Sequence, residues 1–418
     1  MSAHALELMA AAVFAIALIH TFSTKSFDKL AQRHPKHSGL FHLLGEVEIV
    51  FGFWAFILIG LIAIFSSSTV AVQYVESRQY TEPLFVFVIM VIAASAPLIN
   101  IVQKITVRLA KMMPINLLLA QVWLSLAMVP LLGSFITEPA AMTIAALMLG
   151  PLVFKKNIPE KLKYAALGVL FVNISIGGTL TSYAAPPVLM VAETWHWDSL
   201  FMASTFGWKA AIAVMINATI LSYFLNRPLT KSASANPLSK QSSIPLLVSM
   251  IHMAFLIGVV LFAHHPIIFF GLFLLFLGFS QAYNQYQTPL IIKEGLLVGF
   301  FLAGLVVLGG LQQWWLQPIV TNLTPIQLFF GATGLTAITD NAALTYLGSL
   351  ITGISDEAKY MLMAGAVTGG GLTVIANAPN PAGAALLKEG FEDGSISAKW
   401  LFVGAILPTV CAATLFLI

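Results

Sequence analysis

The chain has 418 residues, of which 59% are hydrophobic and only 9% are charged, and its formal net charge is +3. A soluble domain carries about 25% charged residues, so this composition excludes an ordinary water-soluble protein and indicates helices embedded in a lipid bilayer. The small positive charge gives no reason to expect nucleic acid as a partner, and the single cysteine, Cys411, excludes an internal disulfide.

Apolar runs that approach or reach the ~20 residues needed to cross a bilayer follow one another along the chain. They fall near residues 8–22, 43–65, 84–102, 114–133, 141–154, 164–185, 204–225, 244–262, 267–280, 295–311, 324–337, 341–354, 360–380 and 400–418. The loops predicted to be outside hold only Arg78 and Lys359, Lys209 lies inside a span, and the other basic residues fall in inner loops. This asymmetry follows the positive-inside rule and predicts that both termini lie outside, with Trp400 at the inner interface.

Two pairs of apolar runs are predicted to be re-entrant hairpins. Basic residues stand on both sides of segment 114–154, so it enters and leaves the membrane on the inner side. Segment 324–354 is preceded by the uncharged stretch from Gln312 to Asn322 and followed by Asp356 and Glu357, as expected for a hairpin from the outer side. Each half then reads as three spans, a hairpin, an interrupted span and a final span. We therefore expect an all-α polytopic membrane protein built from two inverted-topology repeats.

One short motif occurs once in each half. The run Ile136-Thr137-Glu138-Pro139-Ala140-Ala141 is echoed by Ile338-Thr339-Asp340-Asn341-Ala342-Ala343, and Gly177-Gly178-Thr179-Leu180-Thr181 is echoed by Gly369-Gly370-Gly371-Leu372-Thr373. The glycines permit backbone angles and close approaches that other residues refuse, and the prolines that follow, Pro186, Pro187, Pro379 and Pro381, end regular helix. Interrupted segments at matching places in two halves indicate the binding site of a secondary transporter.

Glu138 and Asp340 are the carboxylates at the two predicted hairpin tips. A functional role is direct coordination of a small cation, with protonation of the same groups when the cation leaves. Low dielectric favours the neutral carboxyl group and a bound cation favours the charged one, which is the chemistry of exchange at a shared site. The alternative is that each carboxylate caps a hairpin helix or pairs with a lysine for structure.

Polar oxygens near these carboxylates are candidate cation ligands, because a hard cation such as Na⁺ prefers oxygen. They belong to Thr137, Thr339, Asn341, Thr181 and Thr373, and to Asn173, Asn377 and Asn380 at the borders of the interrupted spans. The alternative role is helix capping and hydrogen bonding between helices.

Lys209 lies deep in an apolar span, where an unpaired ammonium group is costly. We expect it to have a carboxylate partner or to lose its proton readily. It is a candidate proton carrier, or the charge that neutralises Glu138.

These motifs resemble the sodium/proton antiporter family of the ion transporter superfamily. The resemblance rests on Thr137–Thr143, Gly177–Thr181 with Ala184–Pro187, Thr339–Thr345 and Asn377–Pro381. It implies a homodimer in the inner cell membrane, with an elevator-like transport domain moving against a scaffold. The scaffold would comprise residues 1–103 and 226–311, including a linker at 226–243, and the transport domain residues 104–225 and 312–418.

We therefore predict a secondary active transporter that exchanges a monovalent cation, Na⁺ before Li⁺ or K⁺, for protons by alternating access. The bilayer is the expected partner, and no cofactor is implied beyond the transported ions. No nucleophile triad, phosphate loop or metal cluster suggests an enzyme. The alternative is a Na⁺- or H⁺-coupled symporter of a small organic or inorganic anion on the same fold, which would need a positive centre.

Overall fold

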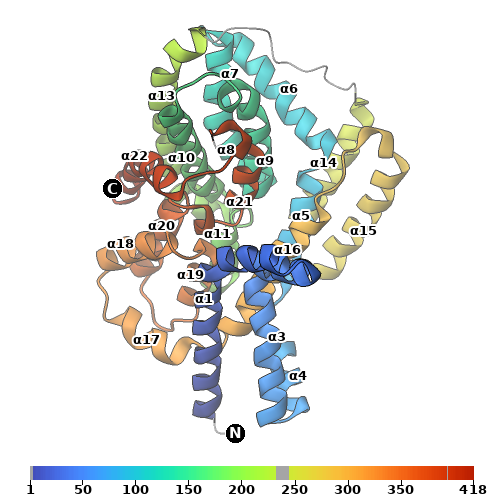
Figure 1. The fold of residues 1–418 in the computed structure, drawn as a ribbon, viewed down its shortest axis with the longest axis vertical. Helices are drawn as coiled ribbons and strands as arrows, with labels where there is room; N and C mark the ends of the chain where they lie inside the picture. Colours follow the sequence, from blue (N-terminus) through green and yellow to red (C-terminus); the bar gives the residue numbers. More distant parts are fainter. Residues whose placement is uncertain (1–2, 232–243, 393) are drawn as a thin grey trace.

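The computed structural model describes residues 3–231, 244–392 and 394–418, and every regular element in these ranges is helical (Figure 1). This confirms the predicted all-α class. Most of the predicted linker at 226–243 lies outside the described residues, whereas its first residues continue helix α13 to Lys231.

The helices of the first half precede the linker. They are α1 (Ala3–Arg33), α2 (Ser38–Gly45), α3 (Val47–Phe65), α4 (Ser68–Glu76), α5 (Thr81–Ala93), α6 (Ala96–Met112), α7 (Leu117–Leu126), α8 (Met128–Ile136), α9 (Glu138–Leu149), α10 (Glu160–Gly177), α11 (Pro186–Trp195), α12 (Ser199–Met202) and α13 (Trp208–Lys231).

The second half holds the remaining helices. They are α14 (Leu246–Leu261), α15 (Pro266–Ala282), α16 (Ile292–Gly309), α17 (Gln313–Thr321), α18 (Pro325–Thr336), α19 (Asn341–Ser349), α20 (Asp356–Gly369), α21 (Asn380–Leu387) and α22 (Ala398–Phe416).

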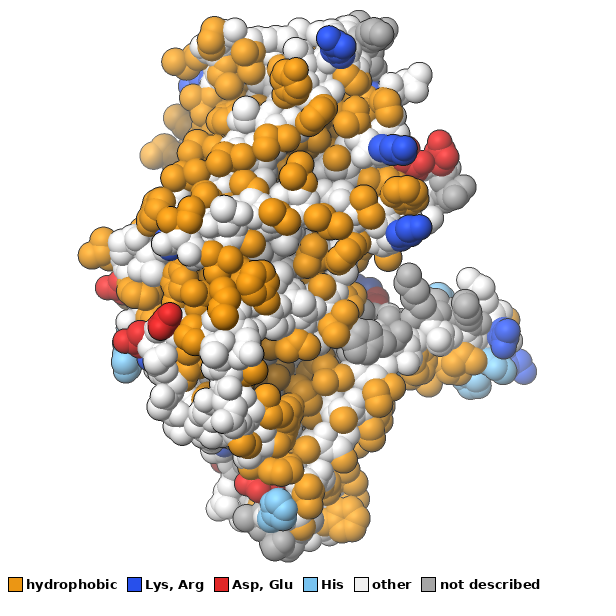
Figure 2. All heavy atoms as spheres, turned by 90° about the vertical axis from the view of Figure 1, so that its left-hand side faces the viewer, with side chains coloured by type: hydrophobic (Ala, Val, Ile, Leu, Met, Phe, Trp, Pro, Cys, Tyr) orange, Lys and Arg blue, Asp and Glu red, His pale blue; other side chains and the backbone are white. Residues whose placement is uncertain are grey.

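Within the described residues, 6 helical stretches are long and apolar enough to cross a membrane, or up to 8 if each bent pair counts as one span. One such pair is α5 with α6, which bends by 64° where Ser95 and Pro97 interrupt the helix. The chain is therefore a multi-pass helical membrane protein. Figure 2 agrees with this, because apolar side chains cover much of the face that carries α13, α18 and α22.

The two predicted hairpins differ in length. In the second, α18 has 12 residues and α19 has 9, both too short to cross a bilayer at 1.5 Å per residue. In the first, α7 and α8 together form a 20-residue apolar stretch, Leu117–Ile136, which is long enough to span, and α9 returns from it.

Both predicted helix breaks are confirmed. Helix α10 ends at Gly177, passes through a 3₁₀ turn, η3 (Gly178–Leu180), and the chain becomes helical again at Pro186. Helix α20 ends at Gly369, passes through η6 (Val374–Ala376), and the chain resumes as α21 at Asn380.

The helices pack in two groups. Helices α1, α3, α5, α14, α15 and α16 contact one another, whereas α10 packs on α13 and α22, α18 on α20, and α11 on α19. In Figure 1 the second group occupies the left of the view, with α8 and α9 above α18 and α19. The hairpin tips and the helix breaks thus belong to the same group.

Candidate functional site

The first hairpin turns at Thr137, between α8 and α9. Its backbone has φ 81° and ψ 150°, a region that is essentially restricted to glycine, and its side chain is buried. Pro139 is tolerated in the first turn of α9 because the N–H groups there have no partner within the helix. The tip is therefore a sharp, strained turn that places the next residue, Glu138, at the start of a helix.

Glu138 is fully buried. Its Oε2 accepts a hydrogen bond of 2.9 Å from Nδ2 of Asn377, whereas its Oε1 has no hydrogen-bond partner among the described residues. Gly178 packs directly against the carboxyl group. The contact with Asn377 joins the first hairpin to the second helix break, so residues from both halves meet at this carboxylate.

Asp340, at the second tip, has a different environment. Its Oδ1 accepts hydrogen bonds from the backbone N–H groups of Ala342 (2.8 Å) and Ala343 (3.2 Å), so it caps α19. The carboxylate is only partly buried, and it lines a small cavity of about 20 Å³ with Thr339, beside Leu18 of α1.

Three buried asparagines surround the helix breaks, and their amide nitrogens are already engaged. Asn377 donates to Glu138, Asn380 donates to the carbonyl oxygens of Gly370 (2.7 Å) and Thr373 (2.9 Å), and Asn341 donates to Ser175 Oγ (3.5 Å). The Oδ1 atoms of all three asparagines are buried and have no hydrogen-bond donor among the described residues.

These groups form one connected cluster around the end of α10. Gly178, at that end, touches Glu138, and Ser175, one turn earlier, contacts both Asn341 and Gly370. Gly370 in turn accepts from Asn380. Oxygen acceptors therefore outnumber free donors at this point of the structure.

The predicted threonines mostly hold the backbone. Thr181 donates to Ser134 O (2.6 Å) and Thr373 donates to Ala337 O (2.8 Å), so each helix break is tied to its own hairpin. Thr339 donates to Leu335 O within its turn. Thr137 is the exception, because its buried hydroxyl has no partner in the described part of the chain.

Asn173 lies in a separate network. Its amide donates to Leu126 O (2.8 Å) and Val214 O (3.2 Å), and its oxygen accepts from Asn217 (2.9 Å). With donor and acceptor both engaged, it joins α10 to α7 and α13.

Lys209 also lies apart from the carboxylates. Its Nζ donates to the Tyr360 hydroxyl (2.9 Å) and stands 4.8 Å from the centre of that ring. The Tyr360 hydroxyl in turn donates a hydrogen bond to Phe416 O (2.6 Å). Among the described residues, Lys209 has no carboxylate partner, which was one of the two expectations. Aromatic faces and a hydroxyl stabilise the ammonium group instead.

The glycines at the breaks serve close packing. None of Gly177, Gly178, Gly369, Gly370 and Gly371 has a positive φ, so the unusual backbone angles expected there are not used. A Cβ would instead collide with a neighbour at every position, for example 2.1 Å from Ser175 Oγ at Gly370 and 2.5 Å from Glu138 Oε1 at Gly178.

Several polar residues of the cluster were not predicted. Ser134 Oγ donates to Gly177 O (2.7 Å) and accepts from Leu180 N (2.9 Å), and Ser175 donates to Val367 O (2.7 Å). Each stands two residues before a motif that the sequence singled out, and this position is the signal that could have found them.

The arrangement favours a small cation or a proton over other ligands. Within the described residues, no group of three or more His, Cys, Asp or Glu side chains that would hold a transition metal is present. Buried carboxylate and amide oxygens without donors suit a hard monovalent cation, and a protonated carboxyl group supplies one O–H donor to one of these oxygens.

Comparison with known proteins agrees with this chemistry. A search of curated proteins found no match to this chain. A family model described as "Putative Na+/H+ antiporter" matches residues 5–418, nearly the whole chain. The match covers both hairpins and both helix breaks, and the chain therefore belongs to this Na⁺/H⁺ antiporter family.

Proposed function

We propose that the protein exchanges Na⁺ for protons at the Glu138 carboxyl group. The observation that carries the proposal is the pairing of a fully buried carboxylate with acceptor oxygens that have no donors among the described residues. Such oxygens are costly unless a cation or a proton satisfies them. A cation and a proton that need the same carboxyl oxygen exclude one another, and this competition couples their transport.

The ligand set follows from the orientation of the amides. Because the nitrogens of Asn341, Asn377 and Asn380 are engaged, their oxygens are the atoms left for the cation. Glu138 Oε1 supplies the charge, and Thr137 Oγ1 a further oxygen. Asp340 instead caps α19 at the second tip.

The geometry supports alternating access by a mobile body. The hairpins, helix breaks and α22 pack in one group, which corresponds to proposed transport regions 104–225 and 312–418, and the other group to proposed scaffold regions 1–103 and 226–311. Thr181 and Thr373 each tie a helix break to its own hairpin, which supports two repeats. We assign the protein to the inner membrane as an elevator-type homodimer with both termini outside.

Proton movement in proteoliposomes tests this assignment. A pulse of Na⁺, Li⁺ or K⁺ is expected to drive protons out of vesicles that carry the wild-type protein, with Na⁺ most effective. Glu138→Gln keeps the shape and an acceptor for Asn377 but removes the charge, and it is expected to abolish the response. Thr339→Ser is a matched control, because its hydroxyl can still donate to Leu335 O. Full exchange by Glu138→Gln would reject the site.

The symporter alternative is tested in the same vesicles. An anion needs donors or a positive centre, and Lys209 is engaged with Tyr360 rather than with the oxygen cluster. Uptake of an anion that depends on Na⁺ and releases no protons would replace the antiporter proposal.

A further inference from the structure

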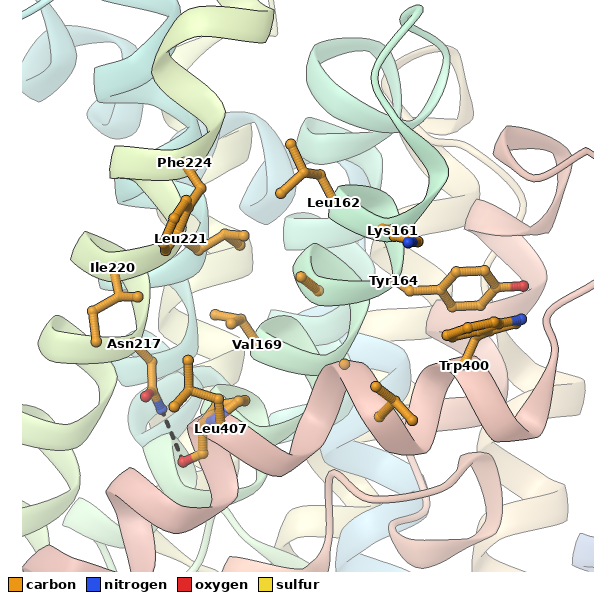
Figure 3. Close-up of a pocket in the computed structure, with 14 residues that line it drawn as sticks. Lys161, Leu162, Tyr164, Val169, Asn217, Ile220, Leu221, Phe224, Trp400 and Leu407 are labelled. Atoms are coloured by element: carbon orange, nitrogen blue, oxygen red, sulfur yellow. Dashed lines mark hydrogen bonds between the residues drawn. The ribbon is translucent and has the colours of Figure 1, made fainter.

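A membrane-facing groove lies between α10, α13 and α22, away from the oxygen cluster. Its volume is about 380 Å³, within the range of small-molecule sites. Figure 3 shows Leu221, Ile220 and Phe224 on one wall and Leu407 and Val169 on the others. Asn217, at the deep end, already donates to Asn173 and to Pro408 O, so the interior is apolar.

Close helix packing forms the groove and keeps it open. Gly168 of α10 and Gly404 of α22 meet so closely that a Cβ at Gly168 would lie 2.4 Å from the Gly404 backbone. Small residues at a crossing bring two helices together and leave a hollow beside the contact. Large side chains at its rim point outward, with Phe224 56% and Leu407 60% exposed. The groove therefore opens onto a surface that a bilayer covers.

One end of the groove is basic and aromatic. Lys161, Tyr164 and Trp400 gather there in Figure 3. Lys161 is exposed and forms no ion pair or hydrogen bond with any described residue, whereas Lys163 donates to Gly390 O. Lys399 adds a second cation, 5.7 Å from the Trp400 ring centre. The nearest carboxylate in sequence, Glu160, accepts from Glu392 N.

We propose that this groove binds one acyl chain of a phospholipid whose anionic head group contacts Lys161. The apolar walls fit the chain, and the free lysine complements the negative charge of the head group. The distribution of basic residues predicts that this end faces the cytoplasm, where anionic lipids attract basic residues. Trp400 and Tyr164 suit the head-group level, because their rings are amphipathic.

Lipid retention by the purified full-length protein tests the proposal. After delipidation, phosphatidylglycerol is added in detergent and bound lipid is counted by native mass spectrometry, with phosphatidylcholine of the same chains as the comparison. We expect about fivefold tighter retention of phosphatidylglycerol, the factor that about 1 kcal/mol per basic residue gives. Lys161→Gln should remove this preference, and Lys104→Gln, an exposed control on α6, should keep it.

A second variant tests the chain site. Val403 lines the groove and is 48% exposed, so Val403→Trp fills the space with little effect on folding, and it should reduce retention of both lipids. Equal retention of both lipids by the wild type, or an unchanged preference in Lys161→Gln, would overturn the proposal. If glycerol phosphate alone prevents retention of phosphatidylglycerol, the groove would be assigned to a free anion. If Val403→Trp loses the dimer but keeps its lipid, the groove would be assigned to a second copy of the chain.

Discussion

Replacing Gly178 by alanine places a methyl group against the Glu138 carboxyl. A Cβ there would lie 2.5 Å from Oε1, whereas ordinary contacts begin at 3.4 Å, so the oxygen must move by about 0.9 Å, the difference between these distances. Metal sites tolerate about 0.2 Å in ligand distance. Loss of one charged contact is worth about 1.5–3 kcal/mol, or about 10- to 150-fold in apparent affinity. We expect the KM for Na⁺ to rise by this factor.

The adjacent glycine provides the matched control. A Cβ at Gly177 would lie 2.7 Å from the backbone oxygen of Pro130, which cannot rotate away, so Gly177→Ala should lower the free energy of unfolding by about 1–3 kcal/mol. In Gly178→Ala the crowded group is a side chain, and stability should fall less. The assays are Na⁺-driven proton movement in proteoliposomes and thermal unfolding. A wild-type KM in Gly178→Ala, or equal KM changes in both variants, would refute the assignment of Glu138 as a ligand.

Three further substitutions address the tips and the lysine. Asp340→Ala should cost about 1 kcal/mol by thermal unfolding because α19 loses its cap, whereas Asp340→Asn keeps the accepting oxygen; equal losses would contradict the capping role. Thr137→Gly should stabilise the protein by about 1 kcal/mol or more because it relieves the strained backbone, and unchanged unfolding would argue against that strain. Lys209→Met and Tyr360→Phe should change the rate of exchange by equal amounts, and the double variant by less than the sum of the two, while the pH profile of exchange stays in place. A shifted pH profile in Lys209→Met would make Lys209 a proton carrier.

The elements of the fold were predictable where local chemistry decides them. The breaks after Gly177 and Gly369 and the restart at Pro186 follow from residues that end or begin helices in any context. The turn at Thr137 was predictable in place but not in conformation, because threonine rarely adopts a positive φ and only the surrounding packing can impose it.

The candidate site was predictable in part. Glu138, Asn377 and Asn380 were singled out by motif, but the hydrogen bond from Asn377 to Glu138 spans 239 residues and depends on tertiary packing. Asn173, at the border of an interrupted span, was grouped with them, although its partners lie on α7 and α13. The partner of Lys209, Tyr360, was missed because a phenol in an apolar helix gives no signal for pairing.

The glycine run at the second break affects how rigid this region stays during the proposed transport cycle. Gly369 touches Thr333, Gly370 touches Ser175 and Gly371 touches Val172, so three segments interlock at one point without any flexible backbone angle. Slackening the break would separate all three contacts at once. We therefore expect the proposed ion site to stay rigid through the proposed transport cycle, and turnover to depend on the viscosity and thickness of the surrounding bilayer more than on local refolding.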